Sequence, residues 1–197
     1  IETLQASEMP LNLRSPIKDM EQDRLIDRPD VEDGKTELET YMDLRRQVLG
    51  LRRSDYEAYM REHGVHAVLI DTNMDGIVYS VVMVVDGTIS LYYQTGGGVL
   101  GMGRKFPDLA MKTRAFVYSC DQMISKLHTA ENTSIPDVDQ RVFYLVTADK
   151  VYKAVSQKTK MAEEPYEIQM LNYLSEKVMT QFISLYEAKN VQEDTTN

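Results

Sequence analysis

Hydrophobic residues repeat at helical spacing in two stretches near the start of the chain. Thr36 and Glu39 form a capping box, in which a hydroxyl and a carboxylate satisfy the free amides of a helix start, and the helical period continues over residues 36–49. A second capping box at residues 54–57 restarts the period over residues 54–63. The pattern predicts two consecutive helices with a kink between them.

The period then changes to the two-residue alternation of β-strands. Three stretches rich in Val, Ile and Tyr cover residues 65–71, 77–85 and 88–94, and Asp-Gly pairs at 75–76 and 86–87 separate them. An Asp-Gly pair between strand-forming residues is typical of a tight hairpin turn. We therefore expect an antiparallel meander, with its middle strand, apolar on both sides, at the centre of a sheet covered on each face.

The second half of the chain returns to helical spacing twice. One helix is expected from Pro107, a residue suited to the first helical position, to about His128. A final amphipathic helix is expected to open at Pro165. Between these helices, residues 141–147 and 151–155 predict a second hairpin.

This order of elements predicts an α+β fold: a five-stranded, largely antiparallel sheet, made of the meander and the hairpin, packed with long amphipathic helices. We expect one domain over residues 35–188, preceded by an acidic, proline-containing arm at residues 1–34 and followed by a frayed tail at residues 189–197. The arm has no sustained period and fits either a flexible leader or a partner-binding segment. Because the sequence begins with Ile1 and not with Met, it leaves open whether the native N-terminus precedes it.

Composition narrows the classes of partner. Lys and Arg number 22 against 31 Asp and Glu, and the net charge of −9 would repel a phosphate backbone, so no nucleic-acid partner is expected. The longest apolar run, residues 77–85, is far shorter than the roughly 20 residues of a membrane-spanning helix, so no membrane association is expected. A single cysteine, Cys120, cannot form a disulfide within the chain, which favours a cytoplasmic location.

A glycine-rich loop at residues 95–105 is the candidate binding site. It formally contains the G-x-G-x-x-G pattern of dinucleotide-binding loops, but hairpins and not a crossover helix join the preceding strands. It also imitates a phosphate-binding P-loop, except that Arg104 stands where that motif has lysine and Lys105 where it has a metal-binding hydroxyl. Nucleotide hydrolysis is therefore not expected.

Two interpretations of the loop stay open. Its glycines could turn backbone amides toward one point, beside a helix start and two cations, and so hold an anionic ligand. Alternatively, the glycines permit a β-bulge and close packing of the next helix over the sheet, with both cations solvated. The candidate anion- or ligand-binding residues are Gly96, Gly97, Gly98, Gly101, Gly103, Arg104 and Lys105.

From the other polar residues we expect no catalytic residue, no metal site and no cofactor. His63 and His66 lie on either side of an expected helix end, and His128 is expected near the end of a helix, so the three histidines do not share the spacing of zinc ligands. No G-x-S-x-G motif occurs, and Cys120 is expected to be buried, where its thiolate is disfavoured.

The loop and its surroundings resemble a known group of proteins. Residues 90–103 read S-L-Y-Y-Q-T-G-G-G-V-L-G-M-G, and residues 141–147 read R-V-F-Y-L-V-T. Together they resemble an uncharacterised bacterial protein family with an S-L-Y-x-x-T-G-G-G-x-x-G-x-G loop and a later R-V-x-F/Y-Y-like strand. The resemblance covers about the middle half of the chain, implies a bacterial, intracellular protein and carries over no catalytic residue.

The element order is separately similar to that of roadblock and longin regulators, small α+β proteins that dimerise and bind GTPases. Here three strands precede the middle helix, where roadblock domains have two.

These features predict a non-catalytic interaction or regulatory protein that acts within a protein complex or homo-oligomer, through an exposed sheet edge, a helix face or the arm. Two alternatives stay open. One is a sensor module that binds an anionic small ligand at Gly96–Lys105. The other is an acidic immunity-type inhibitor of a basic toxin, which would bind its partner through opposite charge.

Overall fold

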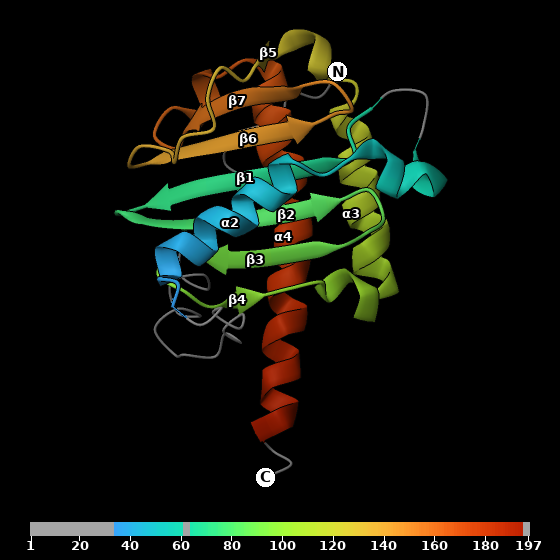
Figure 1. Ribbon diagram of the computed structural model, residues 1–197, viewed down its shortest axis with the longest axis vertical. Helices are drawn as coiled ribbons and strands as arrows, with labels where there is room; N and C mark the ends of the chain where they lie inside the picture. Colours follow the sequence, from blue (N-terminus) through green and yellow to red (C-terminus); the bar gives the residue numbers. More distant parts are fainter. Residues whose placement is uncertain (1–33, 61–63, 195–197) are drawn as a thin grey trace.

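One antiparallel sheet organises the chain in the computed structural model, which describes residues 34–60 and 64–194. The strand order is β4-β3-β2-β1-β6-β7-β5, and every neighbouring pair is antiparallel (Figure 1). The strands are β1 (Ala67–Met74), β2 (Ile77–Val84), β3 (Ile89–Tyr93), β4 (Gly98–Val99), β5 (His128–Thr129), β6 (Gln140–Val146) and β7 (Val151–Gln157). The expected α+β class, the meander β1–β3 and the hairpin β6–β7 are confirmed.

The expected number of five strands is wrong, because the sheet has seven. The two additional strands, β4 and β5, contain two residues each and form its outer edges. A two-residue strand is too short to show an alternating pattern in the sequence. The edge of β3 that the meander was expected to leave free is paired with β4, where Leu91 lies opposite Val99.

The three α-helices of the described residues begin where the sequence predicts. They are α2 (Glu37–Leu49), α3 (Pro107–Cys120) and α4 (Tyr166–Asp194), with short 3₁₀ helices η3 (Arg53–Tyr59), η4 (Met102–Lys105), η5 (Ile124–Lys126) and η6 (Met161–Glu163). The box of α2 is confirmed, since the Thr36 hydroxyl accepts from the Glu39 amide at 3.2 Å and the Glu39 carboxylate accepts from the Thr36 amide at 2.8 Å.

Two expected helices differ from the structure. The second capping box does not form: the Ser54 hydroxyl donates to the neighbouring Asp55 carboxylate at 3.3 Å, and the segment is the 3₁₀ helix η3. The helix expected to reach His128 ends at Cys120, where bonds between residues three apart tighten the chain, and His128 belongs to β5.

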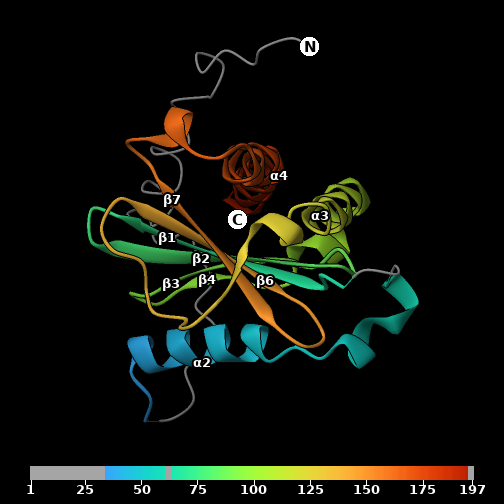
Figure 2. The same cartoon turned by 90° about the horizontal axis from the view of Figure 1, so that it is seen from above.

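Helices cover both faces of the sheet. Figure 2 shows α3 and α4 side by side on one face and α2 on the other. Alternate residues of β1 contribute to a hydrophobic core on each face of the sheet. Val68 and Ile70 belong to the core beneath α3 and α4, whereas Ala67 and Leu69 belong to the core beneath α2. Every residue of β2 except Ile77 is buried, as expected for a central strand.

Helix α4 crosses the sheet and continues past β4 (Figure 1). Its 29 residues span about 43 Å, whereas seven strands about 4.8 Å apart span about 29 Å. The helix runs through Lys189, where the tail was expected to fray, to Asp194. Among the described residues, no helix has the length and apolar character needed to cross a membrane.

Candidate functional site

The side of α2 that faces the sheet carries two buried residues one helical turn apart, Tyr41 and Arg45. No other residue among 34–60 is buried. Beneath them, Asp71 of β1 and Ser80 of β2 lie opposite each other across the strand pair. Helix and sheet therefore bring four polar side chains together at their contact.

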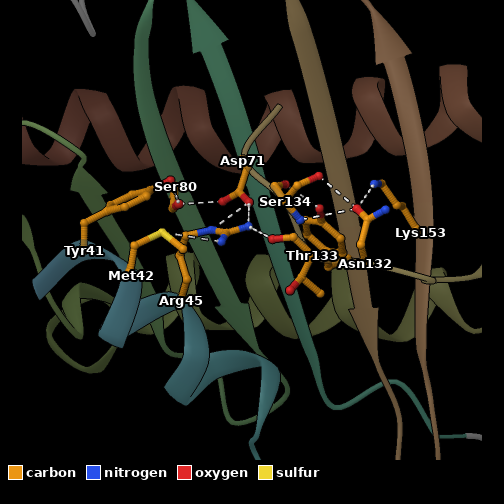
Figure 3. Close-up of polar contacts among 10 residues, drawn as sticks. Tyr41, Met42, Arg45, Asp71, Ser80, Asn132, Thr133, Ser134 and Lys153 are labelled. Carbon is orange, nitrogen blue, oxygen red and sulfur yellow. Dashed lines mark hydrogen bonds and ion pairs between the residues drawn. The ribbon is translucent and has the colours of Figure 1, made fainter. Parts of the chain in front are cut away.

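These four side chains form one connected hydrogen-bond network (Figure 3). Arg45 donates from Nε and Nη2 to Asp71 Oδ2 at 3.0 and 2.5 Å. Ser80 donates to Asp71 Oδ1 at 2.6 Å, and the Tyr41 hydroxyl lies 2.9 Å from Ser80 Oγ. The exposed fractions of the Arg45 and Asp71 side chains are 2% and 0%. Both carboxylate oxygens are bonded, which compensates much of the cost of removing this ion pair from water.

The same network holds the loop between β5 and β6 against the α2 side of the sheet. Arg45 Nη2 donates to the Thr133 carbonyl, the Tyr144 hydroxyl to the Ser134 carbonyl and the Asn73 amide to the Pro136 carbonyl, each at 2.9 Å. Three carbonyls of a loop without regular structure are thereby satisfied by buried side chains. Arg45 thus joins α2, β1 and this loop.

Three tyrosines around the ion pair have raised pKa values. Burial, reinforced by the charge of Asp71, raises the pKa of Tyr41 and Tyr92 and raises the pKa of Tyr144 to about 12. The folded state therefore retains these protons where the unfolded chain, with tyrosine pKa values near 10, releases them. We expect stability to be unaffected by these groups below pH 10 and to fall as the pH rises from about 10 toward 12.

Tyrosinate absorbance and far-ultraviolet circular dichroism, followed together in an alkaline titration, check this prediction. The expected result is that a fraction of the tyrosines ionises only as the protein unfolds. Complete tyrosine ionisation near pH 10 with native dichroism would contradict it.

A second, partly buried ion pair fixes α4 to the opposite face. Arg141 of β6 donates from Nη1 to Glu176 at 2.6 Å and to Asn172 at 3.0 Å, and from Nε to the Thr72 hydroxyl at 3.2 Å. Thr72 directly follows Asp71 on β1, so consecutive residues of one strand contribute to the two networks on opposite faces. Each ion pair joins one covering helix to the centre of the sheet.

The glycine-rich loop is closely packed against the sheet. A Cβ at Gly98 would collide with the Leu91 carbonyl and would lie 2.8 Å from Tyr92 Cα, and a Cβ at Gly103 would collide with the Gly87 carbonyl. Gly98 therefore allows β4 to approach β3, and Gly103 allows η4 to approach the turn between β2 and β3. This geometry agrees with the close-packing interpretation of the loop.

The amides of the loop are largely directed at the protein itself. The amide of Gly96 donates to the Tyr93 carbonyl at 3.1 Å, and that of Gly101 to the Ser90 hydroxyl at 3.0 Å. The Glu37 carboxylate lies against Gly96, so closely that a Cβ there would be 2.8 Å from Glu37 Oε1. A negative charge at this position opposes the binding of an anion.

Arg104 and Lys105 are both exposed in η4. Because Glu37 lies at the loop, we expect inorganic phosphate and nucleotides to leave the Tm and the amide resonances of residues 96–105 unchanged. Arg104→Glu is expected to change the free energy of unfolding by less than about 0.5 kcal/mol. A phosphate-dependent rise in Tm that disappears in Arg104→Glu would instead establish the anion-sensor interpretation.

The remaining candidates among the described residues are His66, His128 and Cys120. His66 is buried, with Nε2 2.8 Å from the Leu51 carbonyl and its ring stacked on Tyr56, and His128 is exposed in β5. His63 lies outside the described residues. Cys120 is buried, and burial raises the pKa of its thiol. Within the described ranges, no group of three or more His, Cys, Asp or Glu side chains is placed to hold a metal ion.

Sequence reasoning missed both ion pairs. Signals for the first pair were present: Arg45 occupies a position in the apolar stripe of the first helix, Asp71 directly follows the apolar residues 67–70, and Ser80 interrupts an otherwise apolar strand. A charged residue within an apolar stripe indicates a buried partner, because an unpaired buried charge is very costly. The sequence does not reveal which residues pair.

Fold and site together define an α+β protein in which helices cover both faces of an antiparallel sheet, and one ion pair, buried beneath α2 and partly buried beneath α4, fixes a helix to each face. Comparisons with protein families, curated proteins and solved structures found no match to this chain.

Proposed function

We propose that this chain is a non-catalytic interaction or regulatory protein that acts within a protein complex or a homo-oligomer. The observation that carries the proposal is the 29-residue helix α4, which continues past the edge strand β4 (Figure 1). A helix that continues past the core that supports it presents a surface for another chain.

The placement of the polar residues supports a non-catalytic role. Arg45, Asp71 and Arg141 are buried and bonded within the protein, so these charges fix helices to the sheet and are not presented to a substrate. The free thiol of Cys120 is buried as well. The glycine-rich loop contributes close backbone packing, as described above.

Charge gives less support to an immunity-type inhibitor. The arm at residues 1–34 carries nine acidic and four basic residues, which leaves −4 of the net charge of −9 for the remaining 163 residues. Electrostatic capture of a basic partner needs a concentrated field of one sign. The domain itself has only a weak excess of negative charge.

Photo-crosslinking tests the role of the projecting helix. A photoreactive amino acid is placed at Glu187, exposed near the end of α4, and in a matched variant at Tyr166, exposed at the start of the same helix. We expect the Glu187 variant, and not the Tyr166 variant, to crosslink to a second copy or to another protein. Light scattering of the wild-type protein provides its mass independently. A monomeric mass at all concentrations, together with no crosslink from Glu187 in the source cells, would refute the proposal.

A further inference from the structure

The outer side of η4 and α3 carries positive charge beside exposed apolar side chains. The exposed charged residues of these two elements are Arg104, Lys105, Asp108 and Lys112. Leu100, just before η4, and Met111 on α3 have exposed fractions of 53% and 61%. Because η4 leads directly into α3, these residues belong to one stretch of surface, which we call the η4–α3 surface (Figure 1). It is basic in a chain whose net charge is −9.

The three cations of the η4–α3 surface have no acidic partner within the described ranges. Exposed arginines near α2 are paired locally, Arg46 with Asp43 and Arg52 with Asp55. None of the ion pairs formed among residues 34–60 and 64–194 includes a cation of the η4–α3 surface. The positive charge of this surface is therefore available to an acidic segment.

The part of the arm nearest the domain has the opposite charge. Residues 19–33 contain seven acids and two bases, whereas residues 1–18 contain two of each. The whole net charge of the arm, −5, therefore comes from the 15 residues that directly precede the described structure. The same segment includes the apolar residues Leu25, Ile26 and Val31. It combines negative charge with apolar side chains, as a complement to the η4–α3 surface requires.

The chain enters the domain within reach of this surface. The Glu37 carboxylate lies against Gly96, after one end of β3, and η4 packs against Gly87, before the other end. The five residues of β3 span about 17 Å, whereas residues 19–33 extend to as much as about 50 Å. The covalent link also gives the acidic segment a high effective concentration at its own domain.

From these observations we propose that residues 19–33 bind the η4–α3 surface of the same chain. Their acids pair with the exposed cations, and their apolar side chains cover Leu100 and Met111. Each exposed ion pair stabilises the contact only weakly, so the contact depends on several pairs together and stays reversible. The arm thereby competes with any acidic, apolar segment of another protein for this surface. This inference is independent of the role proposed for the end of α4.

Paramagnetic relaxation in the full-length protein tests the contact at constant ionic strength. A nitroxide spin label is attached at Pro29→Cys, within the acidic segment, or at Gln5→Cys, in the neutral part of the arm. Cys120 is buried and does not compete for the label. We expect the label at position 29 to remove most of the intensity of the amide resonances of residues 104–112, relative to the reduced label. The label at position 5 should leave most of that intensity.

Charge reversal shows whether attraction between the two charged segments causes the loss of intensity. The surface variant reverses three cations: Arg104→Glu, Lys105→Glu and Lys112→Glu. The arm variant reverses three acids: Asp23→Lys, Asp30→Lys and Glu32→Lys. With the label at position 29, each variant alone is expected to restore the intensities, and the two combined in one chain to lose them again. The matched control, Arg46→Glu with Arg52→Glu, reverses cations that have local partners and should leave the loss unchanged.

Three results would overturn the proposal. One is full intensity at residues 104–112 with the label at position 29, and another is a loss that persists in the arm variant, which leaves residues 34–194 unaltered. The third comes from mixing spin-labelled protein with isotope-labelled protein that has no spin label. Loss of intensity in that mixture would show that the arm binds a second copy and not its own chain.

Discussion

Arg45→Met is expected to lower the free energy of unfolding by about 3–5 kcal/mol. The substitution removes both bonds to Asp71 Oδ2 and the bond to the Thr133 carbonyl. Asp71, which is fully buried, would keep only the bond from Ser80. Urea unfolding followed by circular dichroism measures the effect.

Two further variants show whether the loss of stability comes from leaving Asp71 unpaired or from any substitution in α2. Combining Arg45→Met with Asp71→Asn in one chain is expected to recover much of the loss, because no charge then remains buried. Arg46→Met, next in sequence but with a side chain 76% exposed, should change the stability by less than about 0.5 kcal/mol. Equal losses at positions 45 and 46 would show that the buried pair has no special role.

Gly103→Ala is expected to destabilise the protein by about 3 kcal/mol or more. The added Cβ would collide with the Gly87 carbonyl, a backbone atom that cannot rotate away, so η4 and the turn between β2 and β3 must separate. Because η4 leads directly into α3, the separation also displaces the start of that helix. Urea unfolding gives the loss, and amide resonances near Gly87 and Phe106 locate it.

Gly101→Ala is the matched control within the same loop. Gly101 has a φ of +66°, a left-handed conformation, but an added Cβ there meets nothing within 4 Å. The expected cost is therefore the backbone strain alone, about 1 kcal/mol. A loss at position 103 no larger than that at 101 would mean that close packing does not explain the glycine-rich loop.

These experiments address a common feature of the fold, the attachment of helices to the two faces of one sheet. Asp71 and Thr72 on β1 point to opposite faces, one toward α2 and the other toward the network that holds α4. A slip of one residue in the pairing of β1 would reverse both contacts. The two ion pairs thereby favour one register, in addition to any contribution to stability.

Local patterns were enough to predict several elements. The Asp75-Gly76 turn has positive φ at both residues, as the hairpin signal requires, and the start of α2 has the predicted capping box. Pro107 begins α3, and α4 begins one residue after Pro165. Each of these features depends on residues within a few positions of one another.

Local patterns predicted less of the candidate site. The glycine-rich loop was recognised, and close packing was one of two open interpretations, but the atoms that require its glycines belong to Leu91, Tyr92 and Gly87, which only the fold places there. The edge strands β4 and β5 were missed because pairing with β3 and β7, and not their own composition, makes them strands.

What the sequence determined by itself was therefore the class of the fold, the meander, the hairpin and the helix starts, since periodicity, turn chemistry and capping act over short distances. The tertiary structure alone decided that β1 joins the meander to the hairpin by pairing with β6, and that Arg45 meets Asp71 and Arg141 meets Glu176. Those partners are 26 and 35 residues apart. Their pairing depends on which strands and helices become neighbours, and that depends on the burial of the whole chain.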